Sequence, residues 1–140
     1  MELNERMPED FAEILLDISN RYKCYKVGAA LSIDDADDFI KCENYCLGKS
    51  IYQWESQFWE KPLQDDQYEL YEAGIDTTFC LINNNYSGNE LRAIRISGNF
   101  KVRHLPWYKD YIKMNVSQDE IDNWKQNNKS SSILNTCLKL

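Results

Sequence analysis

The chain is poor in the residues on which nucleotide-binding loops and membrane anchors depend. It contains five glycines, and none forms part of a G-x-G-x-x-G or G-x-x-x-x-G-K pattern. Binding of a nucleotide through such loops is therefore not expected. No run of about 18 apolar residues is present, so the sequence offers no membrane-spanning helix. Residues 1–6 lack the basic and apolar regions of a signal peptide, and we expect a cytoplasmic protein.

Histidine is almost absent, which restricts the catalytic chemistry that the chain can support. His104 is the only histidine, and a Ser–His or Cys–His pair would have to use it. The alternation of residues 100–105 places His104 on the same side as Phe100 and Val102, which is the expected core side. A structural role is therefore favoured. A small enzyme that uses carboxylates, or a cysteine with His104, remains the alternative.

The five cysteines are an odd number and are spread from Cys24 to Cys137. This pattern fits reduced, buried thiols better than a disulfide framework. Cys42 and Cys46 are four residues apart on an expected helix, and two thiolates on one helical face can bind zinc. A structural zinc site needs four ligands, however, and the only plausible distant additions, Cys24 and His104, do not fall in a ligand-spaced pair. Core packing explains the spacing of Cys42 and Cys46 equally well. The sequence therefore predicts no metal site and no cofactor.

Charge is divided unequally between the two halves of the chain, which has a net charge of −7. Residues 1–76 contain 18 Asp and Glu against 7 Lys and Arg, whereas residues 77–140 contain 5 against 9. The acidic half also contains a run of large aromatic residues between Tyr52 and Tyr71. The basic stretch from Arg92 to Lys113 can pair with the acidic half. Direct nucleic-acid binding is not expected at this net charge, because neutralisation of phosphates dominates such binding.

Hydrophobic periodicity predicts an α+β domain over residues 1–129, with residues 130–140 as a C-terminal tail that is docked or frayed. We expect an antiparallel β-meander of about four strands, including an N-terminal strand, packed with four to five short helices. The expected helices begin at Pro8, at Ser32 or Asp34, at Ser50, at Trp107 and at Ser117, and the second of them is expected to end near Gly48. The expected strands cover 25–33, 75–82, 90–97 and 100–105. Strand 75–82 is apolar on both faces, so it is predicted to be central. Ser50 with Gln53, and Ser117 with Glu120, form capping-box patterns.

Four aspartates, Asp34, Asp35, Asp37 and Asp38, form an acidic cluster at the start of the second expected helix. The cluster lacks the spacing and the glycine of an EF-hand loop. Carboxylates at a helix N-terminus cap backbone N–H groups and interact favourably with the helix dipole, but one or two are enough. The remaining carboxylates are either solvated or part of a binding face.

The aromatic run and its neighbouring carboxylates predict a surface that binds a protein. Trp59 and Tyr52 fall outside the apolar stripe of the short helix, and exposed Trp and Tyr are frequent in binding hot spots. Acidic residues around them would steer a basic partner. The predicted binding residues are Tyr52, Glu55, Trp59, Glu60, Asp65, Asp66, Tyr68, Glu69 and Glu72, together with Asp34, Asp35, Asp37 and Asp38.

These features predict a stoichiometric inhibitor of a basic, nucleic-acid-acting protein. It would act by occlusion, as an immunity protein that neutralises a cognate toxin or as a phage-type anti-defence protein. The small enzyme is the second hypothesis. The third is a structural or assembly module that docks on another chain through residues 133–140. The sequence makes no prediction of oligomeric state.

Overall fold

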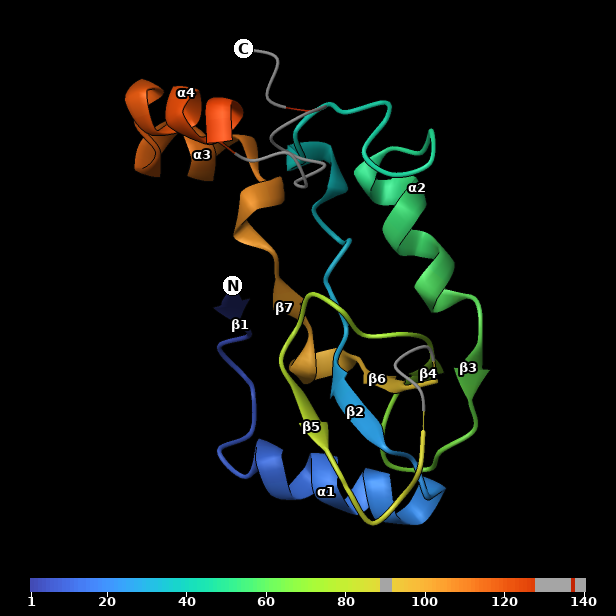
Figure 1. The fold of residues 1–140 in the computed structure, drawn as a ribbon. Coiled ribbons are helices and arrows are strands. Elements are labelled where there is room, and N and C mark those ends of the chain that lie inside the picture. Colours follow the sequence, from blue (N-terminus) through green and yellow to red (C-terminus); the bar gives the residue numbers. More distant parts are fainter. Residues whose placement is uncertain (89–91, 128–136, 138–140) are drawn as a thin grey trace. The chain divides into compact units, whose positions relative to one another are not determined.

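The computed structural model describes residues 1–88, 92–127 and 137 (Figure 1). In this part of the chain it has four α-helices and seven strands, and the strands pair mostly antiparallel. The predicted α+β class is confirmed. The chain divides into two compact units. Unit 1 comprises Met1–Ser32 and Phe58–Arg103, and unit 2 comprises Ile33–Gln57 and His104–Leu140.

Among its described residues, unit 1 contains one α-helix and the seven strands. They are α1 (Phe11–Tyr22), β1 (Glu2–Leu3), β2 (Lys26–Ala29), β3 (Pro62–Leu63), β4 (Leu70–Glu72), β5 (Cys80–Ile82), β6 (Ile94–Ile96) and β7 (Val102–Arg103). Five strands form one sheet in the order β3-β4-β6-β2-β5, while β1 pairs with β7 separately. Only β2 and β6 are parallel neighbours, and every other pair is antiparallel.

The core of unit 1 lies between α1 and the sheet (Figure 1). Leu15 and Ile18 of α1 are almost completely buried there. The buried residues of the cluster are Leu15, Ile18, Val27, Leu70, Ile94, Ile96 and Phe100. Because Leu15 and Ile18 are three residues apart on one helical face, the periodicity seen in the sequence accounts for this packing. The helix starts at Phe11, three residues after the expected Pro8, and ends before Lys23, which has a φ of 49°.

The order of the strands differs from the expected meander. Strand β5, which lies within the stretch 75–82, is an edge strand, and β2 lies between β5 and β6. The prediction that 75–82 is central is therefore wrong. Its apolar residues are buried by other means, since Ile75 is 3% exposed and Phe79 makes an edge contact with Phe11 of α1 at a centroid distance of 5.5 Å. Ile82, at the end of the strand, is 43% exposed.

Unit 2 contains three α-helices and two 3-10 helices within its described residues. They are α2 (Ile51–Ser56), α3 (Lys109–Asn115), α4 (Gln118–Asn127) and the 3-10 helices Ala36–Asp38 and Leu105–Trp107. Both capping boxes are confirmed. The Ser50 hydroxyl accepts from the N–H of Gln53, whose side chain accepts from the N–H of Ser50. Ser117 and Glu120 make the equivalent pair of bonds at α4. Two further 3-10 helices, Gln57–Trp59 and Gly98–Phe100, occur along the chain.

The expected helix from Asp34 to Gly48 is wrong beyond its first turn. Only Ala36–Asp38 is helical, and Phe39 has an extended backbone. The N–H of Ile40 donates to the carbonyl oxygen of Trp107 at 2.7 Å instead of to a residue one turn earlier. The Phe39 ring packs edge-on against Trp107 and Tyr108, at centroid distances of 5.5 and 5.1 Å. Tertiary contacts of an aromatic side chain thus replace the local helix that the apolar spacing predicted.

The expectation that all cysteines are reduced is also wrong in this structure. Cys42 and Cys137 form a disulfide across 95 residues of sequence, while Cys24, Cys46 and Cys80 are free. Disulfides are rare in reducing compartments, so the cytoplasmic location stays a prediction. The rest of the predicted tail 130–140 lies outside the described residues, and the single-domain boundary 1–129 also stays a prediction. No helix of the described chain is long and apolar enough to cross a membrane.

A count of thiols tests the disulfide. We expect the denatured, unreduced protein to react with a thiol reagent at three cysteines, and at all five after reduction. Substitution of Cys42 by serine should raise the first count by one, because Cys137 is released. Five reactive thiols before reduction would show that the bond does not form.

The close approach of β2 and β5 predicts that Gly28 tolerates no side chain. A Cβ atom at Gly28 would lie 2.5 Å from the carbonyl oxygen of Phe79 and 2.8 Å from the Cβ of Cys80. We expect Gly28→Ala to lower the free energy of unfolding by about 1–3 kcal/mol, measured by urea denaturation. Gly98→Asn is the control, because Gly98 faces open space and asparagine tolerates its φ of 62°. Equal unfolding midpoints for Gly28→Ala and the wild type would contradict this packing.

Candidate functional site

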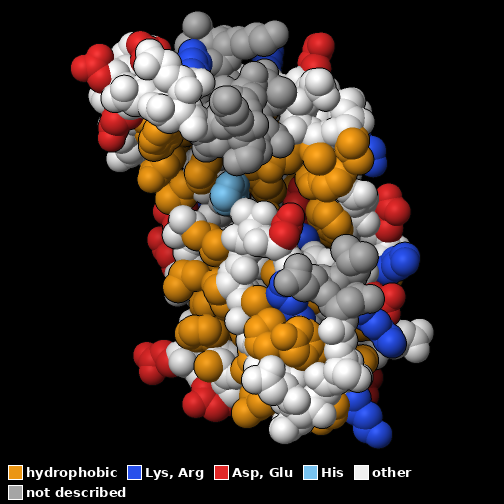
Figure 2. Space-filling model, in the orientation of Figure 1, with side chains coloured by type: hydrophobic (Ala, Val, Ile, Leu, Met, Phe, Trp, Pro, Cys, Tyr) orange, Lys and Arg blue, Asp and Glu red, His pale blue; other side chains and the backbone are white. Residues whose placement is uncertain are grey.

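The predicted binding residues are divided between the two units. Seven belong to unit 1: Trp59, Glu60, Asp65, Asp66, Tyr68, Glu69 and Glu72. Six belong to unit 2: Tyr52, Glu55, Asp34, Asp35, Asp37 and Asp38. On the face drawn in Figure 2, Asp and Glu side chains are seen in several small groups.

Asp65 serves the fold of unit 1 and is not an exposed acid. Its side chain is 2% exposed and forms an ion pair with Arg21 of α1. Burial alone would raise the pKa of the carboxyl group, but hydrogen bonds from Arg21, from the backbone N–H groups of Gln67 and Tyr68, and from Tyr22 together lower its pKa to about 2. Asp65 thus fixes the loop before β4 to the end of α1. The sequence predicted Asp65 as part of an exposed partner surface, whereas its carboxyl group is buried in this network.

The predicted aromatic residues of unit 1 are half-buried and pack against other aromatic rings. Trp59 is half-buried and makes an edge contact with Tyr71 of β4 at a centroid distance of 5.0 Å. Tyr68, also half-buried, packs edge-on against Phe100 at 5.9 Å. The hydroxyl of Tyr71 donates to Glu69 Oε1 at 2.5 Å. This bond, with burial and the negative charge of Glu69, raises the pKa of Tyr71 to about 12.

Among the predicted binding residues of unit 1, four carboxylates are exposed and form no ion pair with any residue that the structure describes. One of them, Glu69, accepts the hydrogen bond from Tyr71, and the other three accept no such bond. They are Glu60, Asp66 and Glu72. Glu72 belongs to β4, Asp66 lies in the loop that Asp65 fixes, and Glu60 directly follows the half-buried Trp59. Their charges are therefore directed at solvent, and a partner can approach them without breaking an internal ion pair.

The six residues in unit 2 differ in exposure. Tyr52 of α2 is 49% exposed, but Glu55 of the same helix is 2% exposed and is not a surface acid. The turn of α2 that places Ile51 in the core places Glu55, four residues later, on the same buried face. Asp34 and Asp35 precede the 3-10 helix Ala36–Asp38, and Asp37 and Asp38 belong to it. Asp34, Asp37 and Asp38 are exposed, and Asp35 is half-buried. Asp35 makes no side-chain cap bond, so the expected capping role is not found.

The histidine lies in unit 2 in a structural setting. His104 precedes the 3-10 helix Leu105–Trp107, and its ring makes an edge contact with Trp107 at a centroid distance of 4.9 Å. Cys42 cannot act as a nucleophile while it is bonded to Cys137. Among residues 1–88, 92–127 and 137, no group of three or more His, Cys, Asp or Glu side chains is placed to hold a metal ion.

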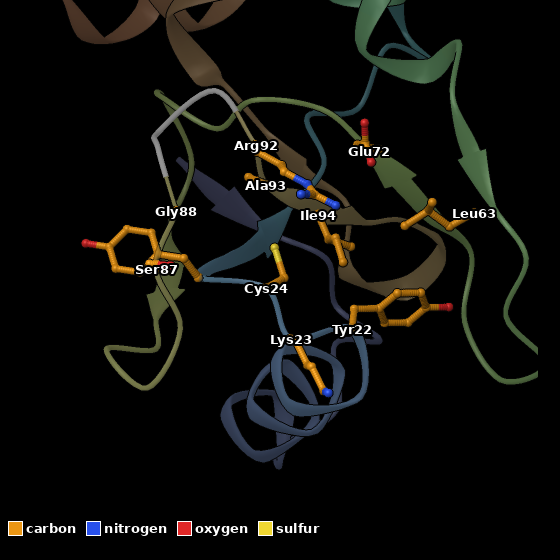
Figure 3. Close-up of a pocket in the computed structure, with 11 residues that line it drawn as sticks. Tyr22, Lys23, Cys24, Leu63, Glu72, Ser87, Gly88, Arg92, Ala93 and Ile94 are labelled. Atoms are coloured by element: carbon orange, nitrogen blue, oxygen red, sulfur yellow. The ribbon is translucent and has the colours of Figure 1, made fainter.

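A pocket of about 420 Å³ in unit 1 was not anticipated from the sequence (Figure 3). Its described walls come from residues 22–25, Leu63, Glu72, residues 87–88 and residues 92–94. Figure 3 shows the Cys24 side chain directed toward Arg92 and Ile94, with Glu72 and Leu63 on the β4 and β3 side. Gly88 packs so closely on Tyr25 that an added Cβ would lie 2.6 Å from the Tyr25 Cβ. Because five separate segments build the pocket, no local pattern signals it.

A second hollow, of about 500 Å³, adjoins the first through Tyr22. It is lined by Arg21, Tyr22 and residues 64–67. The Tyr22 hydroxyl donates to Asp65 Oδ2 at 2.9 Å and to the carbonyl oxygen of Gln64 at 3.0 Å. Burial and the bond to Asp65 raise the pKa of Tyr22. Glu72 in the first pocket and Asp66 in the second hollow therefore offer two exposed carboxylates on either side of a fixed tyrosine.

No protein-family model, no curated protein and no solved structure matches the chain.

The Asp65 network predicts a stability change at low pH. The pKa of Asp65 is about 2 in the folded protein against an ordinary 3.8, so its contribution is present above pH 3.8 and is lost as the pH falls toward 2. We expect Asp65→Asn to cost on the order of 1–2 kcal/mol at neutral pH, measured by thermal or urea unfolding. The difference from wild type should shrink as the pH falls from about 4 to 2. The control Asp66→Asn should change stability by less than about 0.5 kcal/mol, and a pH-independent effect of Asp65→Asn would contradict the ion pair.

Proposed function

We propose that this chain is a stoichiometric binding protein that covers a basic surface of a nucleic-acid-acting protein. It acts by occlusion, either as an immunity protein against a cognate toxin or as a phage-type anti-defence protein. The observation that supports this proposal most is the set of exposed, unpaired carboxylates Glu60, Asp66 and Glu72 beside half-buried aromatic rings in unit 1. Carboxylates in this setting can take the place of phosphates on a surface that normally binds nucleic acid.

The rigidity of the surrounding structure favours this role. Asp65 holds the loop that carries Asp66, and Tyr71 and Trp59 pack against each other beside Glu69. Side chains on such a frame lose little conformational entropy when a partner binds. Hollows on either side of Tyr22 provide concave surfaces into which a lysine or arginine of the partner can extend. Tyr22 and Trp59 supply the aromatic contact area that hot spots use.

The two alternatives have less support from the described residues. An enzyme that uses Cys42 with His104 is inconsistent with the disulfide at Cys42. Cys46 remains as a free cysteine in the unit that contains His104. The assembly module depends on residues 133–140, of which only Cys137 lies in the described part of the chain.

Removal of three charges tests the proposed surface. Tagged wild-type protein and the variant Glu60→Gln/Asp66→Asn/Glu72→Gln are used to capture proteins from the native host lysate at low salt and at about 0.5 M salt. The wild type should recover one basic protein in stoichiometric amount, and binding should weaken at high salt because the attraction is electrostatic. With that protein purified, the triple variant should bind at least about tenfold more weakly. The partner's activity on nucleic acid should stop at an equimolar amount of wild type.

A matched variant separates local from global charge effects. Glu5→Gln/Glu9→Gln/Glu13→Gln removes the same number of exposed carboxylates from the N-terminal part of unit 1. Its affinity for the partner should stay within about threefold of wild type. Equal weakening by both variants would show that net charge alone matters and would remove the assigned surface. A partner that stays fully active when saturated would remove the inhibitor function.

A further inference from the structure

Unit 2 contains a cavity that is separate from the two hollows of unit 1 and that the proposed function does not use. Its volume is about 660 Å³, within the range of about 300–1,000 Å³ that small-molecule sites occupy. Its described lining consists of Ile40, Lys41, Lys109, Ile112, Lys113, Val116, Gln118, Ile121 and Cys137. Helices α3 and α4 form one wall, the extended stretch 40–41 forms another, and Cys137, fixed by its bond to Cys42, completes it.

The interior of this cavity is aliphatic. Ile112 of α3 and Ile121 of α4 are 6% and 3% exposed, and Val116, the extended residue that directly follows α3, also lines the cavity. Ile40 approaches from the other wall. Aliphatic surface of this kind favours a hydrocarbon chain, because every buried methylene group leaves water.

The charges at the cavity are all positive among its described lining residues. Lys109 and Lys113 are four residues apart and share one face of α3, and Lys41 lies on the opposite wall. No carboxylate is part of the described lining. Lys109 Nζ donates one hydrogen bond to the main-chain oxygen of Asp37 at 2.8 Å, which leaves two of its three N–H donors for a ligand. Lysine stems can pack on the apolar wall while their ammonium groups stay at the rim.

We propose that this cavity binds a free fatty acid, with the alkyl chain among Ile112, Val116 and Ile121 and the carboxylate between Lys41, Lys109 and Lys113. An aliphatic interior and a rim of three ammonium groups are complementary to a single hydrocarbon chain with one anionic end. A neutral lipid gains nothing from the lysines, and a polar anion gains nothing from the isoleucines. The ligand's carboxylate forms charge-assisted hydrogen bonds with the lysines.

Titration with saturated carboxylates below their micelle concentrations tests the site. Octanoate, decanoate and dodecanoate are added to isotopically labelled full-length protein, and binding is followed by NMR at the methyl groups of Ile112, Val116 and Ile121 and by calorimetry. We expect saturable binding at one site, with affinity rising about threefold to fourfold for each methylene group added. Decanol, which has the same chain without the charge, should bind more weakly than decanoate.

Variants separate the contributions of charge and cavity. Lys41→Met/Lys113→Met keeps the apolar stems and should weaken decanoate about fivefold to tenfold, while decanol binding stays unchanged. The control Lys23→Met/Lys125→Met removes two exposed lysines outside the cavity and should leave decanoate affinity unchanged. Val116→Phe should weaken both ligands because it fills the cavity.

Three results would overturn the proposal. The first is the absence of saturable binding by all three carboxylates, and the second is equal affinity for decanoate and decanol. The third is an equal loss of decanoate affinity in the two double-lysine variants. None of these outcomes bears on capture of a basic protein by unit 1, so the proposed function and the fatty-acid site are tested separately.

Discussion

Contact of β2 with strands on both of its edges is the constraint on which the rest of unit 1 depends. Val27 is completely buried, and Gly28 pairs with Cys80 of β5 on one side and with Arg95 of β6 on the other. The absence of a Cβ at Gly28 lets β5 come this close. With β2 fixed, β6 and β4 follow in order, and α1 covers the sheet through Leu15 and Ile18. The surfaces that carry the exposed carboxylates are built on this sheet.

The acidic residues of the chain fall into two groups with different physical roles. The side chains of Asp65 and Glu55 are nearly inaccessible to solvent, and Asp65 is held ionised by four hydrogen-bond donors. Glu60, Asp66 and Glu72 face water and have no internal cation among the described residues. A count of Asp and Glu along the sequence does not distinguish the buried carboxylates from the exposed ones. Only burial and hydrogen bonding distinguish a carboxylate that stabilises the fold from one that is available to a partner.

The features that the sequence could predict are those determined by residues close together in the chain. Both capping boxes involve residues three positions apart, so local chemistry determines them and the predictions were right. The α+β class follows from the change between helical and strand periodicity. The order of the strands, the extended backbone after Phe39 and the Cys42–Cys137 bond depend on residues far apart in sequence, and these predictions failed. The pocket beside Cys24 requires five segments to meet, so its lining could not be predicted from the sequence alone.

The edges of the five-stranded sheet have a consequence for the behaviour of the protein at high concentration. An open strand edge is a template for pairing with another molecule, and long, flat edges promote aggregation. One edge strand, β3, has two residues and begins with Pro62, which has no N–H to donate. The other, β5, has three residues and is followed by Asn83, whose side chain bonds back to Ser19 and Asn20 of α1. Both edges are short, and such edges disfavour pairing of the folded sheet with a second molecule.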